Sequence, residues 1–152
     1  MSLVQKKIIF ISISLLLYLA ALFMPGYTHF TTWSYGETLP GWECIGLGLC
    51  TSEWISKFMN PFPFISWLSN LPFVVGLIIL LFARRRKGFK VASVFLLVAF
   101  CMALGSLICY PYPLKFYPQP GCITWLASQF MMFTGAFLLK RETTIPPSEL
   151  FI

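Results

Sequence analysis

Four long apolar stretches, separated by polar or charged segments, dominate this sequence. They cover about residues 8–24, 62–82, 91–110 and 122–139, and none of them contains Asp, Glu, Lys, Arg or His. As α-helices rising 1.5 Å per residue, they would be roughly 25–32 Å long. That length matches the ~30 Å hydrocarbon layer of a bilayer. The pattern therefore predicts an all-α integral membrane protein, folded as a bundle of four transmembrane helices.

Composition agrees with this interpretation, because 58% of the residues are hydrophobic, only 11% are charged and the mean hydropathy is +0.80. These values exclude an ordinary soluble domain. Four spans take up about half of the 152 residues and leave outer loops at 25–61 and 111–121. We therefore expect a single membrane domain over residues 1–152.

The basic residues predict the orientation. Nine of the eleven fall on one side of the spans, and proteins keep such residues on the cytoplasmic side. Both termini are therefore expected inside, in a multi-pass membrane protein. The net charge of +6 could suggest nucleic-acid binding, but the basic residues do not form a polar face interleaved with aromatic residues. Their position at the ends of spans favours membrane lipid as the partner and no nucleic acid. The nine are Lys6, Lys7, Arg84, Arg85, Arg86, Lys87, Lys90, Lys140 and Arg141.

The second stretch contains proline at two informative places. Asn60-Pro61 has the residues of a helix start, an N-cap side chain followed by a proline that needs no hydrogen bond. Pro72 lies further inside and predicts a kink at about residues 68–71. Asn70, beside that kink, is expected to pair with the interrupted backbone.

A polar layer is predicted inside the bundle. Asn70, Gln129 and Cys101 lie about 10–15 Å from the outer ends of their spans, near the level of Ser14 and Tyr18. Buried amides need partners, so we expect hydrogen bonds between helices. A small polar ligand site is the alternative.

Aromatic residues are dense in the loops on the outer side. Residues 53–60 have the spacing of a short amphipathic helix that lies on the membrane surface. We expect the first outer loop to pack on the helix ends as an aromatic cap and to bind lipid or a partner protein. The residues singled out for this cap are Trp33, Trp42, Glu43 and Trp54.

Four of the five cysteines, Cys44, Cys50, Cys109 and Cys122, fall on or near the outer face. Disulfide bonds form in oxidising compartments, and four cysteines allow three pairings. Cys109 and Cys122 are the best pair, because they end two consecutive spans joined by one short link. Cys44–Cys50 follows by elimination, while pairs that cross between the loops stay open.

Four spans with two outer cysteine pairs resemble the disulfide-generating membrane proteins of the DsbB type. That resemblance implies a thiol–quinone oxidoreductase, with Cys44, Cys50, Cys109 and Cys122 as redox residues and a quinone as cofactor. The chain departs from that family because five residues separate Cys44 from Cys50, where the family has Cys-x-x-Cys, and no arginine lies on the outer side. Structural disulfides are therefore favoured.

A second resemblance is to small uncharacterised four-helix bacterial inner-membrane proteins. It rests on Gly41-Trp42-Glu43 with Gly46 and Gly48, followed by the Asn60-Pro61 entry to the second span. It covers most of the chain and implies a bacterial inner membrane as the location, but it implies no activity.

Few residues are suited to catalysis. The chain has one histidine and lacks a Gly-rich phosphate loop, a His-Glu-x-x-His motif and a Gly-x-Ser-x-Gly motif, so we expect no metal site and no cofactor. We predict a non-enzymatic accessory or scaffold protein that binds a partner or lipid through its outer cap. The alternatives are the thiol–quinone oxidoreductase and, despite the absence of a carboxylate in any span, a small transporter subunit.

The first testable prediction is a structural disulfide between Cys109 and Cys122. Closing a loop of about this length stabilises a protein by roughly 3 kcal/mol in the chain-entropy model, so Cys109→Ser should lower stability. Mass spectrometry of a non-reducing digest should recover the linked peptide. Recovery of both cysteines as free thiols after an acid quench would instead favour the oxidoreductase.

Overall fold

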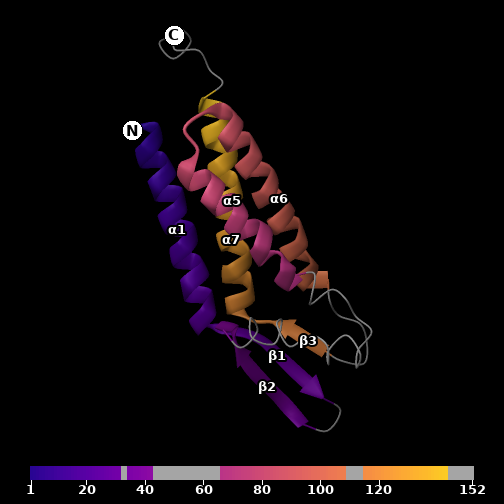
Figure 1. The fold of residues 1–152 in the computed structure, drawn as a ribbon. Helices are drawn as coiled ribbons and strands as arrows, with labels where there is room; N and C mark the ends of the chain where they lie inside the picture. The colour runs from indigo at the N-terminus through magenta and orange to yellow at the C-terminus, as the bar shows by residue number, and fades with distance from the viewer. Residues whose placement is uncertain (32–33, 43–65, 109–114, 144–152) are drawn as a thin grey trace.

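The structure, a computed structural model, describes residues 1–31, 34–42, 66–108 and 115–143. It is mostly helical, as predicted, with the helices in one bundle and a small sheet at one end (Figure 1). Three helices are long and apolar enough to cross a membrane, and the apolar helix at Ser66–Phe82 is shorter. The elements are α1 (Leu3–Phe23), β1 (Pro25–Thr31), β2 (Ser34–Pro40), α5 (Asn70–Phe82), α6 (Arg86–Ile108), β3 (Lys115–Pro118) and α7 (Pro120–Glu142).

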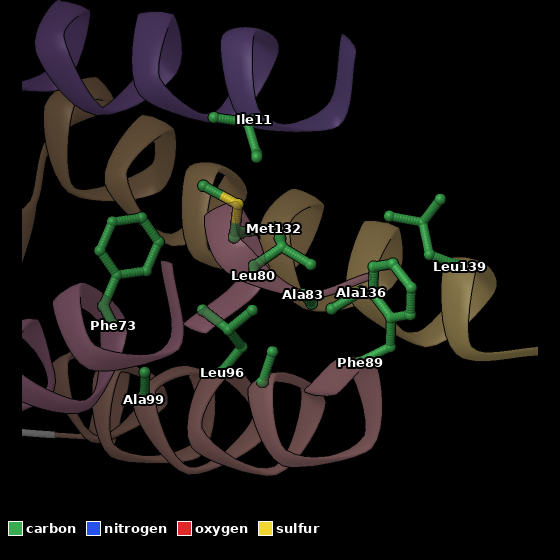
Figure 2. Packing of buried hydrophobic residues seen from close by; sticks show 11 residues of the cluster. Ile11, Phe73, Leu80, Ala83, Phe89, Leu96, Ala99, Met132, Ala136 and Leu139 are labelled. Atoms are coloured by element: carbon green, nitrogen blue, oxygen red, sulfur yellow. The ribbon is translucent and has the colours of Figure 1, made fainter. Parts of the chain in front are cut away.

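Helix α7 is the central element of the bundle, because it packs against both α1 and α6 while α5 packs mainly on α6. Side chains from all four helices meet in one apolar core (Figure 2). Small residues let the backbones approach closely: a Cβ on Gly135 of α7 would lie 2.5 Å from the ring of Phe10 on α1. The labelled core residues are Ile11, Phe73, Leu80, Ala83, Phe89, Leu96, Ala99, Met132, Ala136 and Leu139.

Helix α1 starts before the predicted apolar stretch. Ser2 accepts a hydrogen bond from the backbone of Gln5, and the Gln5 side chain accepts one from the backbone of Ser2. This capping box satisfies two donors that the first turn of a helix otherwise leaves open. The helix therefore includes Lys6 and Lys7, although the sequence pattern predicts that they precede the span.

The helix that precedes α6 is interrupted near the predicted place. Residues 66–68 are helical, Ser69 forms a turn, and α5 begins at Asn70. Pro72 consequently lies in the first turn of α5, where its missing N–H leaves no hydrogen bond unmade. The interruption thus lets the chain accommodate a proline that would clash inside a continuous helix.

A three-stranded antiparallel sheet lies at the end of the bundle where α1 ends and α7 begins (Figure 1). Its strand order is β2-β1-β3, with Thr28 of β1 opposite Thr38 on one side and Tyr117 on the other. The sequence pattern does not predict this sheet. The aromatic residues of the segment are equally typical of a membrane-interface belt.

Backbone contacts fasten the sheet to the helix ends. The N–H of Gly41 donates to the Met24 carbonyl at 2.9 Å, and the N–H of Gln119 donates to the Gly26 carbonyl at 3.0 Å. Gly41 approaches α1 so closely that a Cβ there would lie 2.1 Å from the Ala21 carbonyl oxygen. A Cβ on Gly121, at the start of α7, would likewise lie 2.6 Å from the Pro25 carbonyl oxygen. The sheet and the bundle therefore form one continuous packed unit at this end.

The opposite end of the bundle carries nine of the eleven basic residues. Lys6 of α1 forms an ion pair with Glu142 of α7, with 2.6 Å between nitrogen and oxygen. Lys7 Nζ donates to the carbonyl oxygens of Leu81 at 2.9 Å and Ala83 at 3.2 Å, at the end of α5. A cation at that position complements the negative end of the helix dipole. These contacts join α1 to the two helices that end beside it.

The second testable prediction is that Gly41→Ala loosens the sheet from the bundle. The new methyl group would overlap a backbone oxygen that cannot rotate away, so a loss of about 1–3 kcal/mol in stability is expected. Gly105→Ala is the control, because the nearest atom there is the rotatable Ser66 Oγ, at 3.2 Å. Thermal unfolding in detergent measures both variants, and equal stability of the two would refute the contact.

Candidate functional site

Asn70 is the centre of a polar layer that crosses the bundle. Its Oδ1 accepts hydrogen bonds from Tyr18 Oη of α1 at 3.0 Å and from Trp125 Nε1 of α7 at 3.2 Å. Its Nδ2 donates to the backbone carbonyl of Trp67 at 2.9 Å. The amide therefore joins three helical segments, and it also serves the backbone next to the interruption, as predicted.

An aromatic contact accompanies these bonds. The ring of Tyr18 stacks on Phe73 of α5, with 5.4 Å between ring centroids and 9° between ring planes. Stacking holds the Tyr18 ring in place, so its hydroxyl group stays directed at Asn70. Ring packing and hydrogen bonding thus act together where α1 meets α5.

Gln129 provides the second amide of the layer and is fully buried on α7. The side-chain amide lies 3.1 Å from Ser69 Oγ. With its nitrogen facing the Ala99 carbonyl of α6, it donates a bond of 3.1 Å there and accepts from Ser69 Oγ and Trp125 Nε1. This orientation pairs both polar atoms of the amide, and it connects α7 to α6 as well as to the interrupted helix.

Buried serines complete the layer. Ser14 Oγ of α1 donates to the Ser128 carbonyl of α7 at 2.7 Å, and Ser128 Oγ donates to the Trp125 carbonyl at 2.7 Å. Ser66 is 4% exposed, and its hydroxyl group has no hydrogen-bond partner among the residues that the structure describes. Apart from Ser66, the hydroxyl groups of the serines in this layer form hydrogen bonds inside the bundle.

Cys101 does not join this layer. The sequence pattern groups it with Asn70 and Gln129 because all three lie at similar depth. The structure places Cys101 on the exposed side of α6, while Ala99 and Ala103 of the same helix are fully buried. Depth is therefore a poor guide, because the rotation of the helix about its axis decides which residues face inward.

The polar layer is suited to holding helices together and poorly suited to catalysis. Its groups are amides, hydroxyls and an indole, and each bond found for the two amides connects to a neighbouring segment. Within the described ranges, no group of three or more His, Cys, Asp or Glu side chains could hold a metal ion. The arrangement therefore supports the packing role predicted for these amides more than a ligand site.

The predicted cap and disulfides are described only in part. Trp42 is 57% exposed and follows Gly41 at the point where the sheet joins α1. Cys122 is buried at the start of α7 and is not bonded to Cys101, the other described cysteine. Both predicted disulfide pairs stay predictions, because each includes a residue outside the described ranges. The candidates outside these ranges are Trp33, Glu43, Trp54, Cys44, Cys50 and Cys109, together with the amphipathic helix predicted at 53–60.

The sequence pattern did not indicate that Ser69, Trp125 and Ser128 are hydrogen-bond partners in the polar layer. Their positions carried a usable signal, because Trp125 and Ser128 precede Gln129 by four residues and one residue on the same helix. Residues four apart share a helix face, so a polar residue buried at Gln129 favours a second polar contact at Trp125.

Comparison of the chain with known protein families, curated proteins and solved structures finds no match.

The third testable prediction concerns the Tyr18–Asn70 bond. Asn70→Leu removes two bonds between helices and should lower stability in detergent by roughly 1–3 kcal/mol, whereas Tyr18→Phe removes one and should cost roughly 0.6–1.7 kcal/mol. The double variant should be little worse than Asn70→Leu alone, since the shared bond is already lost.

Cys101→Ala is the control at similar depth on the exposed side of α6, and we expect it to leave stability unchanged. Fully additive losses for Tyr18→Phe and Asn70→Leu would show that the two side chains do not interact.

Proposed function

We propose that this chain is a multi-pass protein of a bacterial inner membrane, with four spans and both termini in the cytoplasm. In this proposal it has no catalytic activity and serves as an accessory or scaffold subunit that presents its outer cap to a partner protein. The bacterial assignment follows its resemblance to small four-helix inner-membrane proteins.

Large apolar side chains on the outside of every helix support the membrane placement. They are exposed on faces turned away from the bundle core, as at Leu16 of α1, Ile78 of α5, Val94 of α6 and Phe130 of α7. Soluble proteins seldom leave such wide apolar surfaces uncovered, whereas lipid chains cover them at no cost. The short helix at Ser66–Phe82 fits four spans if it continues into residues 62–65, as the sequence pattern predicts.

The observation that carries the scaffold proposal is the fastening of the sheet to the ends of α1 and α7. Binding surfaces are most selective when rigid elements hold them. Here backbone hydrogen bonds and the close approaches of Gly41 and Gly121 hold the sheet, and Trp42 stands exposed beside it. The internal polar layer is used for packing, so the cap is the better candidate for specific contacts.

The fourth testable prediction is that a photo-crosslinking amino acid at Trp42 or Thr38 captures a discrete protein partner in living cells. Both positions are exposed, Thr38 on strand β2 and Trp42 two residues after that strand ends. Ile78 is the matched control, because it is exposed on the middle of α5 and should crosslink lipid. Crosslinking to protein from Ile78 but from neither cap position would contradict the proposal.

A further inference from the structure

Five cations are concentrated in seven residues at the turn between α5 and α6. Arg84 and Arg85 lie in the turn, Arg86 and Lys87 begin α6, and Lys90 follows one turn later. All five side chains are exposed. We call these five residues the basic turn.

The chain has too few anions to balance the basic turn. It contains five glutamates and no aspartate, and Glu142 is already paired with Lys6. Glu37 is on β2, which lies at the other end of the bundle (Figure 1). Even with Glu149 beside one of its cations, the basic turn would keep four positive charges without a counter-ion from its own side of the predicted membrane.

The position of the basic turn relative to α6 adds to this imbalance. The N-terminal end of a helix is the positive end of its dipole and favours acidic residues, but the first turn of α6 contains none. Two other cations at this end of the bundle lie at carbonyl ends of helices: Lys7 reaches the carbonyl end of α5, and Lys140 lies in the last turn of α7. The basic turn is therefore costly to the isolated protein, and an external anion would relieve the cost.

The surrounding surface indicates where that anion comes from. Two residues before the basic turn Phe82 is 80% exposed, and directly after it Val91 is 46% exposed, although Ala83 between Phe82 and Arg84 is buried. The cations thus stand at the edge of an apolar belt, at the level where a bilayer changes from acyl chains to headgroups. A phospholipid can supply acyl chains to the belt and a phosphate group to the cations at the same time.

We propose that the basic turn binds the phosphate groups of anionic phospholipids in the leaflet around this end of the bundle. The proposal rests on the membrane placement given above and is independent of any partner at the cap.

Native mass spectrometry of the full chain in neutral detergent tests this proposal, by titration with phosphatidylglycerol and with phosphatidylcholine of the same acyl chains. The wild-type protein should bind phosphatidylglycerol more tightly. Each cation near an anionic lipid surface contributes about a fivefold change in affinity, so Arg85→Gln/Arg86→Gln should weaken phosphatidylglycerol binding ~25-fold. Binding of phosphatidylcholine should stay unchanged.

Lys57→Gln/Lys115→Gln is the matched control. It removes the same total charge, but from the two basic residues that are not on the predicted cytoplasmic side. We expect it to change phosphatidylglycerol affinity by less than about twofold, because both lysines are predicted on the outer side of the membrane and screening weakens charges beyond about 10 Å. Equal binding of the two lipids, equal weakening by both double variants, or displacement of the lipid by soluble glycerol phosphate would each overturn the proposal. Integration into vesicles of phosphatidylcholine alone tests the membrane placement separately.

Discussion

The packing of α7 between α1 and α6 is the constraint on which the other contacts depend. A helix enclosed on two sides has little room for large side chains, and α7 meets this requirement with Gly121, Ser128, Gly135 and Ala136 at buried positions. Gly135 admits the ring of Phe10, and Ala136 is fully buried in the core shown in Figure 2. In the proposed membrane setting, where burial of apolar surface adds little to helix association, such close packing would supply much of the attraction.

The polar layer follows from that arrangement. Once α7 lies in the centre, Trp125 and Gln129 are enclosed and must pair with other helices. Asn70 can accept from both Tyr18 and Trp125 because the helix interruption at Ser69 brings its amide to the middle of the bundle. The same interruption places Pro72 in a first turn, where proline is harmless. One local irregularity therefore serves both the backbone and the contacts between helices.

The two ends of the bundle differ in how they use their charges and backbone groups. At the sheet end, backbone hydrogen bonds and glycine contacts join strands to helix ends, and these contacts do not depend on ionic strength. At the basic end, Lys6 and Lys7 join α1 to its neighbours, while the basic turn has few anions to pair with. The first end is suited to holding a defined surface, and the second to a charged environment supplied from outside.

The apolar stretches, the basic bias and the proline position were readable from the sequence alone, because helix length, topology and proline sterics are local properties. The depth of Asn70 and Gln129 was also readable, since helical rise is constant. Which residues at that depth face inward was decided only by the tertiary structure. Cys101 lies on the exposed face of α6, turned away from the bundle core.

The sheet is the clearest example of a feature that only the tertiary structure determines. Pro25-Gly26 and Pro40-Gly41 bound a segment rich in tyrosine and threonine, a composition typical of strands but equally typical of a membrane interface. The third strand, residues 115–118, pairs with β1 and begins 84 positions after β1 ends. Strand pairing over such a distance depends on where the helices place the chain ends, so it could be established only once α1 and α7 had been brought side by side.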